Sequence, residues 1–176
     1  MRRIILAVLF LSVLTVFAAS CSANRPSARN ILAKIIEEQN TDPSAGKLYF
    51  CDSQKDIAED GYLSYETKRS LFESKTSFCA DFEKLEDFAI FTSAKTDAYE
   101  IDIFFVRNGE DIPSFEKMLN ARLASIKAAK NSFDEVSQKR IADGKVLTLG
   151  RCVALLITKD NALAEKIIKR SVGYFL

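Results

Sequence analysis

The stretch YEIDIFFVRN, residues 99–108, has the alternating pattern of a β-strand. Successive side chains of a strand point to opposite faces of the sheet. One face carries Tyr99, Ile101, Ile103 and Phe105, and the other carries Glu100, Asp102, Phe104 and Val106. The first face is fully apolar, whereas the second begins charged and turns apolar. We therefore expect a sheet strand that is buried on its first face and carries two carboxylates at the start of its second.

Further apolar runs extend the predicted sheet. They are DFAIFTS at 87–93, KVLTL at 145–149 and CVALLIT at 152–158, with KLYFCD at 47–52 as a shorter candidate. A short polar linker separates the first of these runs from residues 99–108, which favours a hairpin. Gly150 and Arg151 separate the next two runs and favour a tight hairpin.

Amphipathic segments between these strands predict helices. They span residues 31–40, a short stretch that begins at the N-cap Ser64, residues 111–130 and residues 161–173. In residues 111–130, Phe115, Leu119 and Leu123 recur at the spacing of one helix face. From residue 87 onward the order is strand, strand, helix, and then the same again. This order predicts an α+β fold, a mainly antiparallel sheet with helices packed on one face.

The N-terminal segment has the layout of a secretory signal peptide. Arg2 and Arg3 precede an uncharged apolar run at residues 4–19, and small residues then lead to Cys21. A positive start, an apolar run and small residues before a cleavage site are the three parts of such a signal. The run has 16 residues, and a spanning helix needs about 20. The segment is therefore expected to be removed after a signal-peptide helix has directed export.

The residues AASC, 18–21, resemble the lipobox of bacterial lipoproteins, whose cysteine is lipidated and becomes the new N-terminus. Two alternatives stay open, namely ordinary cleavage after Ser20 and an uncleaved anchor. One acyl chain gives marginal membrane binding and two or more, such as palmitate chains, give a stable anchor. We thus expect a lipoprotein signal peptide at 1–20, lipidation at Cys21, a tether at 21–30 and a single α+β domain at 31–176.

The composition excludes several classes of function. The chain has no histidine, which removes the commonest general base and any Ser-His-Asp arrangement. It also has no glycine-rich phosphate loop. The formal net charge is +1, far from the strongly basic face that nucleic acid requires. No cofactor, metal or nucleic-acid partner is therefore expected.

Three cysteines remain after Cys21. Cys152 opens an apolar run and is expected to be a buried free thiol. Cys51 and Cys79 are a possible disulfide, since an exported chain permits one, and free thiols are the alternative. No CxxC spacing points to a redox or zinc site.

Arg122 is a charged residue at the edge of an apolar helix stripe, between Leu119 and Ile126. A carboxylate on a neighbouring strand, Asp102 or Glu100, would suit the bidentate geometry that arginine favours. The residue could instead bind an anion. We favour a structural ion pair, because charged helix residues with buried stems are common.

An acidic cluster is the second candidate for chemistry. Its members are Asp81, Glu83, Glu86 and Asp87. Such carboxylates can bind calcium or support glycoside hydrolysis. No EF-hand spacing is present, and short acidic runs are usually solvated, so neither activity is expected.

The second half of the chain resembles a family of small bacterial envelope proteins. The resemblance lies in EKLEDFAIFTS at 83–93, in the continuous segment from YEIDIFF to AKNSF at 99–133, and in GRCVALLITKD at 150–160. This family is catalogued as domain of unknown function 4358, and its members are typically lipoproteins. Val136 departs from the family pattern, which often has tyrosine there. The resemblance implies a lipoprotein and no particular activity.

The sequence therefore predicts a lipid-anchored extracytoplasmic envelope protein that acts as a binding or accessory module. Its expected partners are the membrane, through Cys21, and an envelope protein or a small ligand. The rival hypothesis is a small extracytoplasmic hydrolase that uses carboxylates, since histidine is missing. A third hypothesis is a small-ligand binder that uses Arg122.

Overall fold

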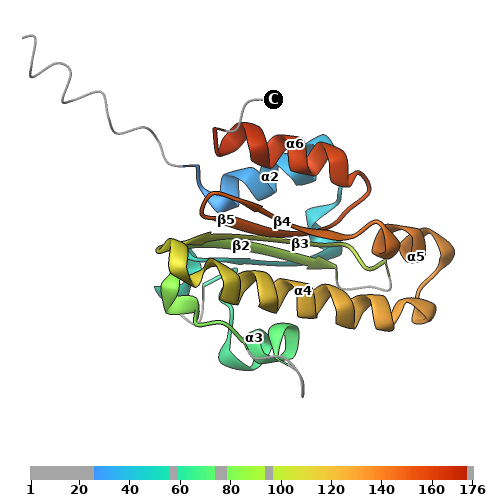
Figure 1. Ribbon diagram of the computed structural model, residues 1–176. Coiled ribbons are helices and arrows are strands. Elements are labelled where there is room, and N and C mark those ends of the chain that lie inside the picture. The colour runs from blue at the N-terminus through green and yellow to red at the C-terminus, as the bar shows by residue number, and fades with distance from the viewer. Residues whose placement is uncertain (1–25, 56–58, 74–78, 94–96, 174–176) are drawn as a thin grey trace, which may run out of the picture.

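A computed structural model describes residues 26–55, 59–73, 79–93 and 97–173. Their core is a five-stranded antiparallel sheet in the order β1-β2-β3-β5-β4 (Figure 1). The strands are β1 Gly46–Phe50, β2 Leu85–Ser93, β3 Glu100–Val106, β4 Lys145–Leu149 and β5 Cys152–Ile157. The α+β class and the antiparallel sheet are confirmed. Both predicted hairpins are present, β2 with β3 and β4 with β5.

The strand β3 lies in the middle of the sheet. Its Ile103 pairs with Ala89 on β2 and with Ala154 on β5. Its Asp102 pairs with Ile90 and Leu155 on the same two strands. Every second residue of β3 therefore faces the same side, and Glu100 shares a face with Asp102.

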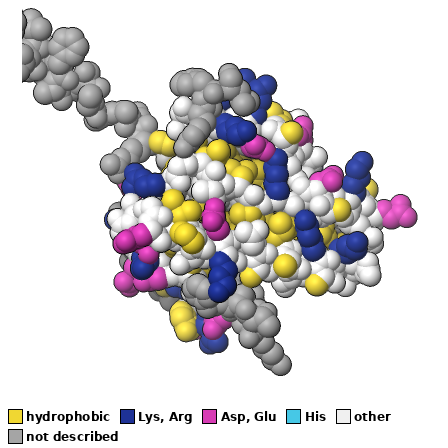
Figure 2. All heavy atoms as spheres, in the orientation of Figure 1, with side chains coloured by type: hydrophobic (Ala, Val, Ile, Leu, Met, Phe, Trp, Pro, Cys, Tyr) yellow, Lys and Arg dark blue, Asp and Glu magenta, His cyan; other side chains and the backbone are white. Residues whose placement is uncertain are grey.

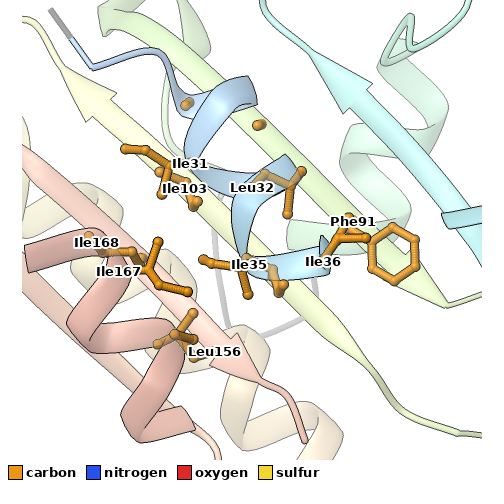
Figure 3. Close-up of a cluster of buried hydrophobic side chains, with 14 of the residues drawn as sticks. Ile31, Leu32, Ile35, Ile36, Phe91, Ile103, Leu156, Ile167 and Ile168 are labelled. Carbon is orange, nitrogen blue, oxygen red and sulfur yellow. The ribbon is translucent and has the colours of Figure 1, made fainter. Parts of the chain in front are cut away.

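One face of the sheet is covered by α2 (Ala28–Glu38) and α6 (Asn161–Ser171), which lie side by side (Figure 1). Figure 3 shows the side chains at this contact, with Ile35 of α2 and Ile167 of α6 above Leu156 of β5. Ile103 of β3 belongs to the same cluster and is fully buried. These residues join the first and last described helices to the centre of the sheet.

The opposite face is covered by α4 (Ile112–Ala128), with α3 (Tyr65–Phe72) and α5 (Glu135–Ala142) beside it (Figure 1). The prediction that helices pack on one face is therefore wrong in this detail. All six residues of β5 are buried, so apolar side chains point to both faces and both must be covered. The helix α5 was not predicted.

Aromatic rings fill the core beneath α4. Phe82, Phe88, Phe104 and Phe115 contact one another with ring centroids 5.4 to 6.5 Å apart. Most of these contacts are edge-to-face, the arrangement that aromatic pairs prefer. This face of the core is thus an aromatic cluster, whereas the α2 and α6 face is mainly aliphatic.

Short 3-10 helices connect the main elements. They are η1 Pro43–Ala45, η2 Asp52–Lys55, η3 Phe82–Lys84, η4 Gly109–Asp111 and η5 Lys130–Ser132. The helix α2 begins at Ala28, so the last residues of the predicted tether form its first turn. Residues 1–20 and Cys21 lie outside the described residues. In the part of the chain that is described, no helix combines the length and the apolar character needed to cross a membrane.

Candidate functional site

The candidate site lies between the start of β3 and the middle of α4. Strand alternation places Glu100 and Asp102 on the face of β3 that α4 covers. On α4, Leu119 and Leu123 are buried against the sheet, and Arg122 lies beside them at the edge of the same stripe. The two periodicities, 2 in the strand and 3.6 in the helix, thus bring one arginine to two carboxyl groups.

Arg122 and Glu100 form a bidentate ion pair. Arg122 Nε donates to Glu100 Oε1 at 2.8 Å, and Nη2 donates to Oε2 at 2.7 Å. The side chain of Glu100 is only 5% exposed and that of Arg122 is 19% exposed. Burial alone would lower the pKa of Arg122, but its hydrogen bonds to Glu100 and the nearby negative charge outweigh this and raise it. The predicted ion pair is present, and its carboxylate is Glu100.

Asp102 lies deeper on the same strand, two residues further along, or about 7 Å. It is fully buried, and neither carboxyl oxygen has a hydrogen-bond partner among the described residues. Burial and then the charge of Glu100 raise the pKa of Asp102 well above its usual value, although Arg122 opposes this. The sequence predicts Asp102 or Glu100 as the partner of Arg122. In the described structure the partner is Glu100, and Asp102 makes no ion pair with Arg122.

A small hollow of about 130 Å³ adjoins the pair at the surface. It is lined by Thr92, Ser93, Ala98, Tyr99, Glu100, Arg122, Ile126 and Phe133. The two donors of Arg122 that bind Glu100 are not available to an anion there. This geometry supports the structural interpretation of Arg122 over the anion-binding one.

A larger hollow of about 510 Å³, here called the Asn161 pocket, lies between α5 and the start of α6. Its lining consists of Val136, Lys139, Arg140, Asp143, Thr158, Lys159, Asp160, Asn161 and Ala162. Much of it is braced by hydrogen bonds, since Asn161 Nδ2 donates to Asp143 O at 2.8 Å and Lys159 Nζ donates to Asn40 O at 2.8 Å. Val136 is 70% exposed at its rim.

Gln39 joins this pocket to the end of α2. Its Nε2 donates to Asp160 O at 2.8 Å, and its Oε1 accepts from the Tyr99 hydroxyl at 3.1 Å. Lys159 donates to Gln39 O at 3.2 Å. The last turn of α2 is therefore held at the same end of the sheet as the Asn161 pocket. The sequence pattern gave no signal for this network, because Gln39 is an ordinary polar residue at a helix end.

A third hollow, of about 600 Å³, lies at the other end of α2 and is here called the Pro26 groove. It is lined by Pro26, Ser27, Glu86, Asp87, Phe105, Leu149, Gly150, Arg151, Cys152 and Val172. Asp87 Oδ2 accepts from Ala28 N at 2.7 Å, so a strand residue caps the first turn of α2. Burial raises the pKa of Asp87, and the hydrogen bond from Ala28 opposes this rise.

The acidic cluster is dispersed in the structure. Asp81 accepts from Glu83 N at 3.0 Å and caps η3, while Glu86 pairs with Arg151 at 3.3 Å. Across the face shown in Figure 2, cationic and anionic side chains are interspersed. Within the described residues, no group of three or more metal-ligating side chains comes together.

The described cysteines are free thiols. Cys51 Sγ lies 3.9 Å from Glu86 O, and Cys79 Sγ lies 3.4 Å from Ala80 O. Burial raises the pKa of both thiols. It raises the pKa of Cys152 to about 12, so this residue is a buried, unreactive thiol as expected. The Cys51 and Cys79 disulfide is not formed here and stays a prediction.

No protein-family model, no curated protein and no solved structure matches this chain. The resemblance to the lipoprotein family of unknown function therefore stays a prediction.

Proposed function

We propose that this protein is an extracytoplasmic envelope protein, anchored in the membrane by lipid on Cys21, whose domain acts as a binding or accessory module. The proposal rests first on the layout of the N-terminal segment, in which Arg2, Arg3 and an apolar run precede a small-residue cleavage site at Cys21.

The proposal is also supported by the way in which the first helix of the domain is held to the sheet. Ala28 is held to β2 through Asp87, and it lies seven residues after Cys21. An extended chain spans at most about 3.6 Å per residue, so the lipidated end would lie within about 25 Å of this point. Such a short tether keeps the domain close to the bilayer and limits how it can turn.

Two different hollows lie at the two ends of α2. The Pro26 groove is lined by Pro26 and Ser27, just before α2, and by Gly150 and Arg151 of the β4–β5 turn. The Asn161 pocket lies beyond the other end of α2, about 16 Å away for 11 residues of helix. The first end would face the lipid headgroups, and the second would face away from the membrane toward a partner.

The Asn161 pocket has the surface chemistry of a contact site for a polar partner. Lys139, Arg140 and Lys159 lie with Asp143 and Asp160 in its lining. The rim of a protein interface is polar and solvent-accessible, and this lining is polar around one exposed apolar side chain, Val136. An envelope protein or a small polar ligand are the partners that this surface supports.

The rival hydrolase hypothesis has less support. The two carboxyl groups of the candidate site, Glu100 and Asp102, lie under α4 at 4% and 0% exposure. A glycosidase needs two carboxyls on either side of a bond in an open site. Substrate would reach this pair only if α4 left the sheet.

The two-ended arrangement can be tested with photo-crosslinking side chains in cells. We would place one at Val136, on the rim of the Asn161 pocket, and one at Arg151, beside the Pro26 groove. The account predicts lipid adducts from position 151 and protein or ligand adducts from position 136. A Cys21→Ala variant is the control and should lose the lipid adducts. Lipid adducts from position 136 and none from position 151 would contradict the proposal.

A further inference from the structure

Strand β3 carries a buried carboxyl group, Asp102, under α4. Asp102 is 0% exposed, and both its oxygens lack a hydrogen bond among the described residues. Its neighbours on the adjoining strands are Ile90 and Leu155, which offer no polar atom in their side chains. Buried polar groups are almost always hydrogen-bonded, and an isolated buried charge is far more costly than a neutral group.

The charges around Asp102 do not balance if it is ionised. The charged groups that act on it in the described structure are Glu100 on the same strand and Arg122 on α4. Arg122 already gives two hydrogen bonds to Glu100. Two carboxylates and one guanidinium would leave a net negative charge in the core. One proton removes that charge.

The position of Glu100 shows where such a proton would go. Glu100 lies two residues before Asp102 on the same face of β3. Burial, the charge of Glu100 and hydrogen bonding between the two carboxyl groups all raise the pKa of Asp102. A protonated carboxyl is a hydrogen-bond donor, whereas an ionised one only accepts. A proton on Asp102 would therefore satisfy one of its oxygens and give Glu100 a further donor.

We propose that Asp102 holds a proton in the folded protein, donates it to Glu100, and thereby links the docking of α4 on the sheet to pH. Arg122 ties α4 to Glu100, so all three groups belong to one contact between helix and strand. Loss of the proton places two negative charges beside one arginine and weakens this contact. This inference does not depend on the lipid anchor or on the partner.

The sign of the pH effect follows from the direction of the shift. The pKa of Asp102 is raised in the folded state. Its contribution to stability is therefore complete below the pKa of an unfolded aspartate, about 3.9, and is lost as the pH rises through the folded pKa. A single proton of this kind changes the equilibrium constant for opening of the contact between α4 and the sheet by at most about tenfold per pH unit.

Infrared spectroscopy tests the protonation directly. The carbonyl stretch of a carboxylic acid is distinct from that of a carboxylate. We expect an acid signal in the wild-type protein at neutral pH and its loss in Asp102→Asn, which keeps the size of the side chain and cannot ionise. In Glu100→Gln, the neighbouring negative charge is gone and Arg122 is freed, so Asp102 should ionise at a lower pH than in wild type. No acid signal in the wild type, or no downward shift in Glu100→Gln, would overturn the proposal.

Hydrogen exchange tests the link to α4. After correction for intrinsic rates, protection of α4 amides should fall with rising pH in the wild type, by up to about tenfold per pH unit. The fall should be absent in Asp102→Asn and kept in Glu37→Gln, which changes an exposed acid on α2. Equal pH profiles for the wild type and Asp102→Asn would overturn the link. A stability gain from Na⁺ or Ca²⁺ at constant ionic strength, in the wild type only, would show that a cation and not a proton neutralises Asp102.

Discussion

Among the ion pairs of the described residues, Arg122 and Glu100 form the most deeply buried one, with side chains 19% and 5% exposed. Removal of one partner from a buried pair leaves an uncompensated charge and costs about 3–5 kcal/mol. We predict a loss of this size in the free energy of unfolding for Arg122→Met, measured by chemical denaturation. Lys34→Met is the control, because Lys34 pairs with Glu38 at 3.9 Å on the surface. It should change stability by less than about 0.5 kcal/mol.

Replacement of both partners should be much less harmful than replacement of one. Apolar residues in place of a complete buried ion pair are often neutral or stabilising. The double variant Arg122→Met with Glu100→Gln removes both charges and keeps an oxygen that can accept the Asp102 proton. It should therefore recover most of the stability that Arg122→Met loses. A double variant as unstable as the sum of its two single variants would show that the two side chains do not act as a pair.

At the scale of single elements, the start of α2 depends on a residue of β2. Ser27 occupies the N-cap position but makes no capping hydrogen bond with its side chain, whereas Asp87 accepts from Ala28 N at 2.7 Å. Loss of a capping side chain costs about 0.5–2 kcal/mol. We predict a loss in this range for Asp87→Ala in a thermal or chemical melt, with little change for Ser27→Ala. The opposite ranking would show that the local cap and not the strand residue fixes the helix.

The contact between β5 and α6 can be tested with two adjacent leucines. Leu155 and Leu156 are both fully buried. Leu156 belongs to the cluster under α2 and α6 (Figure 3), whereas Leu155 belongs to the cluster under α4. In double-mutant cycles with Ile167→Ala, Leu156→Ala should show a coupling energy of about 0.5–3 kcal/mol. Leu155→Ala should add to Ile167→Ala within about 0.5 kcal/mol. Equal coupling for both leucines would contradict the assignment of the two faces.

Most strands and helices could be predicted because their apolar spacing is regular. The alternation in β3, the apolar run in β5 and the stripe of α4 each fix one element. The helix α5 was missed, since only Ser137 and Ile141 are buried in it and one apolar contact makes no periodic pattern. Strand alternation shows which residues share a face of the sheet, but it does not show which helix covers that face. The sequence therefore does not predict that helices cover both faces.

The candidate site could be predicted in part for the same reason. Strand alternation placed Glu100 and Asp102 together, and helical spacing placed Arg122 at the edge of the core. The choice between the two carboxylates depends on how far α4 lies along β3, which is a matter of packing between elements. The Gln39 network and the cap from Asp87 join residues far apart in the sequence, and no local pattern reports such contacts.

At the scale of the whole molecule, the first and last described helices close one face of the sheet together. The helix α2 packs on α6 and on β2, and its two ends are fixed by Asp87 and by the Gln39 network. A tether that leads into α2 would therefore join a rigid part of the domain. Because this part is rigid, a short lipid tether would determine which end of the domain faces the membrane.

Fatty-acid labelling of the protein in its host cell, followed by the intact mass of the mature chain, tests whether Cys21 carries the lipid anchor. The account predicts label in the wild type, no label in Cys21→Ala, and full label in a variant in which Cys51, Cys79 and Cys152 are all changed to alanine. The mature mass should correspond to a chain that begins at an acylated Cys21. A wild-type protein without label, or label that persists in Cys21→Ala, would contradict the account.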